Sequence, residues 1–124
     1  MFNTKFQVSI RDINYGNHLD HLSLIGYLHE ARVQFIRTRG FNENNVDGLH
    51  SHLVVVELQC KYKKESFYGD TLNVTLSTTP KSMFKLLFNY TVTRENIVVA
   101  TAEITVAFIN SVNKPILIPK PFLS

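Results

Sequence analysis

The second half of the sequence limits the fold most, because it holds four consecutive long runs in which apolar and polar residues alternate. The runs lie near residues 54–63, 72–77, 84–92 and 98–108, with turn residues such as Gly69-Asp70 between them. A period of two indicates strands that bury one face. Short connections favour antiparallel pairing of successive strands. We therefore predict an antiparallel meander of strands that are each roughly 10–13 residues long.

The first half of the chain predicts one more strand and one long helix. Residues 6–10 alternate between apolar and polar side chains, as a half-buried strand does. From Leu22 to about Arg39, apolar residues recur at spacings of four, three and four, which fits a helix with a broad apolar face. Asp20 is a candidate N-cap, and Gly40 suits the position after the C-terminus. The predicted core positions of the helix are Leu24, Leu28, Ala31 and Phe35.

This order of elements predicts a single α+β domain over residues 1–124. A helix that is apolar over much of its circumference needs more cover than a flat sheet gives, so we expect a curved five-stranded antiparallel sheet around a central helix. Gly26 lies inside the helix, where we expect another backbone to approach closely. The tail from Asn113 holds three prolines, which cannot donate to a ladder, and we expect it to lie extended over the surface.

Composition excludes several classes of function. Cys60 is the one cysteine, so an internal disulfide and a cysteine-based zinc cluster are both excluded. The net charge is only +3 and the basic residues are scattered, which does not favour nucleic-acid binding. The first residues do not resemble a signal peptide, and no segment has the roughly 20 apolar residues of a membrane span. We expect a cytoplasmic protein without membrane contact.

The polar turn, residues 12–21, joins the first strand to the helix and concentrates the groups that can do chemistry. It contains one glycine, two asparagines, two histidines and two aspartates. The first N–H groups of a helix lack partners within the helix, and the helix dipole favours negative charge there. These residues either act on a substrate or cap the helix. From the residues alone, both interpretations remain open.

The polar turn and the helix together resemble the acyl-CoA thioesterases of the 4-hydroxybenzoyl-CoA type, which have the hotdog fold. That family carries a strand-end pattern Asp-x-Asp-x-x-Gly-His-Val-Asn-Asn, followed by a helix with Tyr-Leu and Glu-Ala-Arg. The matching residues are Asp-Ile-Asn-Tyr-Gly-Asn-His-Leu-Asp-His at 12–21, Tyr-Leu-His-Glu-Ala-Arg at 27–32, Tyr-Gly-Asp at 68–70, and Asn-Lys-Pro at 113–115. The resemblance covers essentially the whole chain.

One departure concerns the carboxylate of the family's mechanism. The second Asp of the pattern is the usual nucleophile or general base, and Asn14 stands in its place. Gly16 comes one place early, with Asn17 inserted before His18. An amide can position a water or donate to a carbonyl, but it cannot accept a proton as a carboxylate does. The resemblance therefore implies the fold directly and leaves the identity of the base open.

The resemblance implies roles for particular residues. Asn14 would position a water, His18 or Asp12 would act as base, and the N–H of His21 would face the thioester carbonyl. Each has a structural alternative: a turn residue for Asn14, a hydrogen-bonded histidine for His18, an ordinary capped helix for His21, and for Asp12 an ion pair with Arg11 or Arg32. Candidate contacts for the substrate, whose coenzyme A carries phosphates, are Tyr15, Gly16, Lys64, Lys81 and Ser82.

The remaining polar candidates favour structural interpretations. Glu30 lies on the helix, where some hotdog enzymes carry a carboxylate, but pairing with an arginine or a partner subunit is favoured. The spacing of His50 and His52 supports no metal site. Cys60 alternates with apolar neighbours, as a core residue does.

These observations predict a hydrolase that splits an acyl-CoA thioester into free acid and coenzyme A. Coenzyme A enters as part of the substrate, and we expect no metal and no organic cofactor. The alternative from another class is a non-catalytic protein that binds acyl-CoA or an acyl-carrier protein, and Asn14 is the residue that motivates it. An uncovered sheet edge predicts a homodimer or homotetramer, with the site at the interface.

Overall fold

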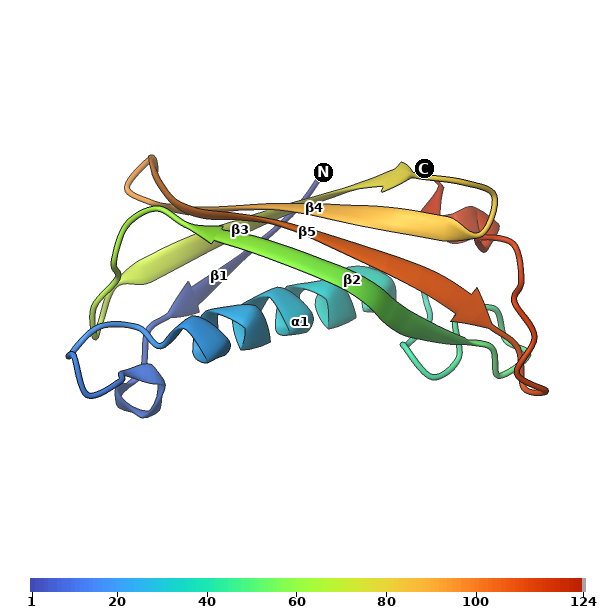
Figure 1. Cartoon of the computed structure of the whole chain (residues 1–124), viewed down its shortest axis with the longest axis horizontal. Coiled ribbons are helices and arrows are strands. Elements are labelled where there is room, and N and C mark those ends of the chain that lie inside the picture. The colour runs from blue at the N-terminus through green and yellow to red at the C-terminus, as the bar shows by residue number, and fades with distance from the viewer. Residues whose placement is uncertain (124) are drawn as a thin grey trace.

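The computed structural model, which describes residues 1–123, shows one long helix lying along the concave side of a curved antiparallel sheet (Figure 1). The helix α1 spans His21–Thr38. The strands are β1 (Phe2–Gln7), β2 (His52–Tyr62), β3 (Thr71–Pro80), β4 (Lys85–Arg94) and β5 (Ile97–Ile109), and short 3₁₀ turns occupy Ile10–Asp12 and Lys120–Phe122. The predicted α+β class, the five-stranded sheet and the strand lengths are confirmed.

The strand order of the sheet is β1-β3-β4-β5-β2, and every pair is antiparallel. The predicted meander is therefore right for β3, β4 and β5 and wrong for β2. That strand pairs with β5 at the far edge, because β1 occupies the position beside β3. The connection from β2 to β3 therefore starts at one edge of the sheet and ends beside β1, the strand at the opposite edge. On its way it passes the polar turn.

The core lies between the apolar face of α1 and the inner face of the sheet. All four predicted helix positions are buried. Alternate residues of β3 and β4, such as Val74 and Phe88, are fully buried as the period of two predicts. The expectation for Gly26 is wrong, because a Cβ built there would meet no atom within 4 Å beyond the helix's own neighbouring backbone. Among residues 1–123, no helix is long and apolar enough to cross a membrane.

Two departures from the predicted strands have local causes. The first strand ends at Gln7, because the chain turns into a 3₁₀ helix at Ile10, whose side chain is 71% exposed. In β2 the register shifts between Val55 and Glu57, so Val56 is the extra residue of a bulge. Its side chain is exposed rather than directed to the core.

The C-terminal tail belongs to the core, which corrects the expectation of a surface segment. The N–H of Ile116 donates to the carbonyl of Phe108 at 2.9 Å. Ile118 and Phe122 are 6% and 1% exposed, and the Phe122 ring stacks on Phe108 with centroids 5.8 Å apart. Pro115 forms an isolated bridge with Ile109, and the tail closes the end of the core that lies opposite the polar turn (Figure 1).

Candidate active site

The polar turn is a tight loop that its own backbone and side chains hold together. Ile13 and Leu19 form an isolated antiparallel bridge, and the N–H of Asn14 donates to the carbonyl of His18 at 3.0 Å. The side-chain Oδ1 of Asn14 accepts from the N–H of Gly16 at 2.8 Å, which is the local bond typical of asparagine in turns. Asn14 therefore has a structural task, and its Nδ2 group remains available as a donor.

The two residues before His18 shape the polar turn in different ways. Asn17 adopts φ 66°, the left-handed conformation that asparagine tolerates best after glycine. Counted from Asp12, Asn17 takes the place of the pattern's glycine, so it is a substitution and not the insertion that the sequence suggested. At Gly16 a Cβ would come within 3.1 Å of Nε2 of His18 and 3.2 Å of Oδ1 of Asn14. Gly16 thus lets two polar side chains lie close together.

The helix begins beside these groups, and among the described residues no acceptor contacts the N–H of His21 or that of Ser23. Asp20 is the N-cap as predicted, since its Oδ2 accepts from the N–H of Leu22 at 3.0 Å and its carbonyl from that of Leu24 at 3.1 Å. The hydroxyl of Tyr62 donates to the carbonyl of His21 at 3.1 Å and ties β2 to this first turn.

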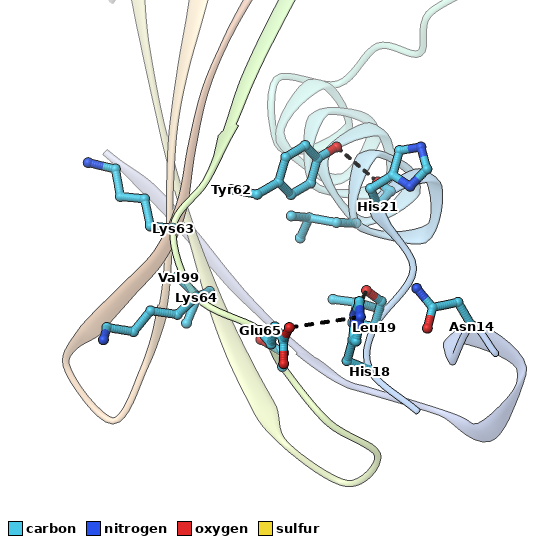
Figure 2. Close-up of a pocket in the computed structure, with 11 residues that line it drawn as sticks. Asn14, His18, Leu19, His21, Tyr62, Lys63, Lys64, Glu65 and Val99 are labelled. Carbon is cyan, nitrogen blue, oxygen red and sulfur yellow. Dashed lines mark hydrogen bonds and ion pairs between the residues drawn. The ribbon is translucent and has the colours of Figure 1, made fainter. Parts of the chain in front are cut away.

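A pocket of about 380 Å³ opens between the polar turn, the start of α1 and the end of β2 (Figure 2). Three of the predicted catalytic residues line it, namely Asn14, His18 and His21, and so does the predicted substrate contact Lys64. The other lining residues are Leu19, Leu24, Tyr62, Lys63, Glu65, Ser66 and Val99. Sequence reasoning grouped Lys63 with Lys64 as basic residues near a strand end, and it assigned the site none of the others.

His18 stands at the mouth of this pocket with its two ring nitrogens in different surroundings. Nδ1 lies 3.3 Å from the carbonyl of Leu19. Since a carbonyl only accepts, that hydrogen bond requires a proton on Nδ1, and Nε2 of the neutral ring is then an acceptor. Nε2 faces the carboxylate of Glu65, with 3.9 Å between Nε2 and Oε1. The ring is therefore oriented so that it can accept a proton from a molecule in the pocket.

Asp12 belongs to a different environment and does not line the pocket. Its carboxylate accepts from the hydroxyl of Tyr27 at 2.5 Å and from that of Ser9 at 3.0 Å. The Tyr27 bond lowers the pKa of the Asp12 carboxyl. No ion pair joins Asp12 to Arg11 or Arg32 within residues 1–123, which corrects that expectation. Asp12 is the last residue of the 3₁₀ helix Ile10–Asp12.

Tyr62 and Cys60 of β2 both lie near the start of α1 or on the strand that leads to it, and both carry groups that stay protonated. Burial raises the pKa of Tyr62 to about 12, so the phenol stays protonated and remains a donor to His21. Cys60 is only partly buried, and burial raises the pKa of its thiol. A protonated thiol is a weak nucleophile, which agrees with the structural interpretation of Cys60.

Several predicted residues lie outside the pocket. Lys81 and Ser82 lie in the β3–β4 turn at the opposite end of the sheet, where Nζ of Lys81 is 3.7 Å from a carboxylate oxygen of Glu57. Tyr15 is fully exposed at the tip of the polar turn. Glu30 is exposed and accepts from the amide of Gln34 at 2.9 Å, rather than from an arginine. Among residues 1–123 no cluster of His, Cys, Asp or Glu has the geometry of a metal site.

Comparison with known proteins decides the family. Residues 8–124 match the model of the thioesterase-like superfamily. The chain belongs to this superfamily. A protein of Aquifex aeolicus (strain VF5) named "Putative esterase" is 33% identical over 103 residues, which is 83% of this chain and 80% of that protein. The recognition of a hotdog-fold thioesterase family is therefore confirmed.

Solved structures of the superfamily's fold overlie almost the whole chain. A hypothetical protein of Aquifex aeolicus has a TM-score of 0.88 and 29% identity, and the match covers 97% of this chain and 94% of that one. A 1,4-dihydroxy-2-naphthoyl-CoA thioesterase of Synechocystis has a TM-score of 0.87 and 19% identity, with coverage of 97% and 90%. The hotdog architecture predicted from the sequence is thus confirmed.

Proposed function

We propose that this protein hydrolyses an acyl-CoA thioester to the free acid and coenzyme A. The observation that carries the proposal is one pocket that brings together the free N–H of His21, the acceptor nitrogen of His18 and the amide of Asn14. Membership of the thioesterase-like superfamily supports the same reaction class. Thioester hydrolysis requires an activated water and donors for the oxyanion, and the pocket has a candidate base in His18 and a candidate donor in the N–H of His21.

The helix start would stabilise the negative charge that develops on the thioester oxygen. The N–H of His21 has no acceptor among the described residues, and it lies at the positive end of the 18-residue helix α1. Tyr62 holds the carbonyl of the same residue, which fixes the orientation of this first turn. Only the backbone of His21 is needed for this role.

His18 is the base that we assign, in preference to Asp12. Its Nε2 faces the pocket, whereas both hydroxyl bonds of Asp12 hold that carboxylate outside it. Asn14 would orient the attacking water or the carbonyl through Nδ2, since its Oδ1 already accepts from Gly16. The proton of the water goes to Nε2 and then to the departing thiolate, so histidine suits the step near neutral pH.

A homodimer would complete the substrate site. None of the residues of β2 is buried in one chain, although Val55, Val56 and Leu58 are 43–52% exposed apolar residues on this edge strand. Antiparallel pairing with β2 of a second copy would cover them. In this pairing the start of one β2 would lie beside the end of the other. Lys81 and Ser82 of the partner subunit would then lie near the pocket and near Lys64, which lines it. Coenzyme A phosphates would bind these cations.

A panel of acyl-CoA thioesters of different chain length and with aromatic acyl groups tests the reaction. Thiol release is followed for each substrate with the purified full chain. We expect turnover of at least one substrate, with a linear dependence on enzyme concentration. Absence of hydrolysis across the whole panel would overturn the proposed function.

Asn14→Ala and Asn14→Asp define the role of the amide. The aspartate can still accept the Gly16 N–H, so the turn is expected to survive, and a carboxylate in this position is expected to raise the rate. Asn14→Ala is expected to lower it by about tenfold, since one positioning hydrogen bond of about 1.5 kcal/mol is lost. Unchanged rates in both variants would show that Asn14 is structural only.

The second candidate is a non-catalytic protein that binds acyl-CoA or an acylated carrier protein. The specific observation in its favour is the missing carboxylate at Asn14, whose Oδ1 serves the turn. Titration calorimetry with a non-hydrolysable acyl-CoA thioether and thiol-release assays on the thioester distinguish the two. Tight binding without turnover would favour this candidate over hydrolysis.

A further inference from the structure

A carboxylate from a distant part of the sequence faces His18 across the mouth of the pocket. Glu65 follows β2, and its Oε1 lies 3.9 Å from Nε2 of His18 (Figure 2). Its side chain is 64% exposed, and within residues 1–123 it has no other hydrogen-bond or ion-pair partner. A surface glutamate without a partner usually needs no explanation, but this one lines the same pocket as Asn14 and His21.

The main chain around Glu65 is fixed to the polar turn. The N–H of Leu19 donates to the carbonyl of Ser66 at 2.7 Å, and Ser66 is 3% exposed. The guanidinium of Arg94 donates to the carbonyl of Glu65 at 2.7 Å. The backbone of Glu65 is therefore held against the residue that follows His18, while its carboxylate remains free. The main chain thus places the carboxylate beside His18 and leaves it available to a molecule in the pocket.

We propose that Glu65 supplies the carboxylate that the polar turn lacks at Asn14, and that it holds the attacking water together with His18. The proposal rests on the proposed thioesterase function. Two acceptors 3.9 Å apart can each accept one proton of a single water molecule, because each hydrogen bond to it is about 2.8 Å long. The water oxygen then keeps a lone pair for the carbonyl carbon of the thioester.

The step balances with the groups that are present. The water oxygen forms a bond to the carbonyl carbon while one water proton passes to Nε2 of His18, and the oxyanion is stabilised at the N–H of His21. The carbon–sulfur bond then breaks, and the imidazolium returns its proton to the thiolate of coenzyme A. The carboxylic acid product releases its own proton to solvent. Glu65 stays ionised throughout and compensates the charge of the imidazolium.

Glu65→Gln tests this role with minimal change in shape. We expect kcat to fall by roughly 10- to 100-fold with KM within about twofold, since His18 keeps part of the general-base effect of about 10²–10⁴-fold. Glu103→Gln, an exposed glutamate in the middle of β5, is the matched control and should leave both constants unchanged. Thermal unfolding of the variants confirms that the fold is intact.

A double variant tests whether the two residues act as one unit. With His18→Gln already present, Glu65→Gln should add almost nothing to the loss in kcat, because the water has lost its base. Additive losses would overturn the shared-water assignment. A lower KM with unchanged kcat in Glu65→Gln would also overturn it, because that result describes a carboxylate that only repels the phosphates of coenzyme A.

The proposed function and the role of Glu65 fail in different ways. A wild-type protein that turns over thioesters while Glu65→Gln retains full kcat overturns the assignment of Glu65 and leaves the thioesterase function standing. A wild-type protein that is inactive on every thioester overturns both. Restoration of most of the rate in Glu65→Asp, whose shorter carboxylate can reach the same water, would support a chemical role over a structural one.

Discussion

Two histidine–glutamate pairs lie within residues 1–123, and only one of them lines the pocket at the start of α1. Nε2 of His29 is 2.9 Å from a carboxylate oxygen of Glu43, closer than the 3.9 Å between His18 and Glu65. The second oxygen of Glu43 accepts from Nε of Arg32 at 2.5 Å, and the side chain of Arg32 is 6% exposed. Both oxygens of Glu43 are thus occupied, and the pair ties the loop after α1 to the buried face of the helix.

The difference shows that short distance is not the mark of a chemical site. One oxygen of Glu43 accepts from the buried guanidinium of Arg32 and the other lies 2.9 Å from Nε2 of His29, so contacts within the protein hold both oxygens. Glu65 and His18 contact each other less closely, and their free positions point into a cavity beside an open helix N-terminus. A pair that is less complete within the protein is the better candidate for catalysis, because its unused bonds are available to a ligand.

The largest expected effect comes from His18→Gln. The glutamine fills similar space but cannot take a proton, so kcat for the best thioester should fall by roughly 10²–10⁴-fold, the usual value of a general base. The free energy of unfolding should change little, because the ring is about one-third exposed and its hydrogen bond to the carbonyl of Leu19 is 3.3 Å long. Thiol release and urea unfolding measure the two quantities. Unchanged kcat would remove His18 from the mechanism.

Glu43→Ala should lower the stability of the fold and leave the activity almost unchanged, which is the opposite of the result expected for His18→Gln. Removal of the carboxylate leaves the buried guanidinium of Arg32 without its partner, which costs roughly 3 kcal/mol of unfolding free energy. Urea denaturation measures this loss, and the additional substitution Arg32→Met should restore most of it. Activity per folded molecule should remain near that of the wild type. A larger effect on kcat than on stability would contradict the comparison between the two pairs.

The fold could be predicted because its signals are local. The alternation along β3 and β4, the four core positions of α1 and the Asp20 cap each depend on residues within one element. The position of β2 could not be predicted, because pairing with β5 instead of β3 depends on where β1 lies in the completed sheet. The buried tail was missed for the same reason, since the partner of Phe122 is Phe108 on a distant strand.

The candidate site likewise contains residues that are neighbours in the sequence, which could be predicted, and residues from distant segments, which could not. The polar turn and the helix start are adjacent in sequence, so Asn14, His18 and His21 could be named together. Tyr62 and Glu65 are more than 40 residues away and reach the site only through bonds such as Tyr62 to the carbonyl of His21 and Leu19 to Ser66. No sequence pattern encodes those contacts, although the missing carboxylate at Asn14 indicates that another could be sought.

Tyr27→Phe tests the structural role of Asp12, whose carboxylate lies outside the pocket. Loss of its hydrogen bond to Asp12 should cost about 1.5 kcal/mol at pH 7, the lower end for a bond to a charged group. This bond lowers the pKa of Asp12 in the folded protein. The stability that the bond contributes is therefore fully present above the usual aspartate pKa of about 3.9, and it is lost as the pH falls through the lowered pKa of the folded state. Urea unfolding of both proteins should therefore converge in acid, and a difference independent of pH would contradict this.

The smallest expected effect belongs to His29→Gln, the counterpart of His18→Gln in the His29–Glu43 pair. The side chain of His29 is 58% exposed, and Glu43 keeps Arg32 as its main partner, so unfolding free energy should change by less than about 1 kcal/mol. Thiol release should proceed at the wild-type rate. Because the same substitution removes a histidine from each pair, the ratio of the two kcat values measures the functional difference between them directly. A loss of activity in His29→Gln comparable to that in His18→Gln would mean that the occupied pair also serves the reaction, and that an open position in the pocket is not what separates them.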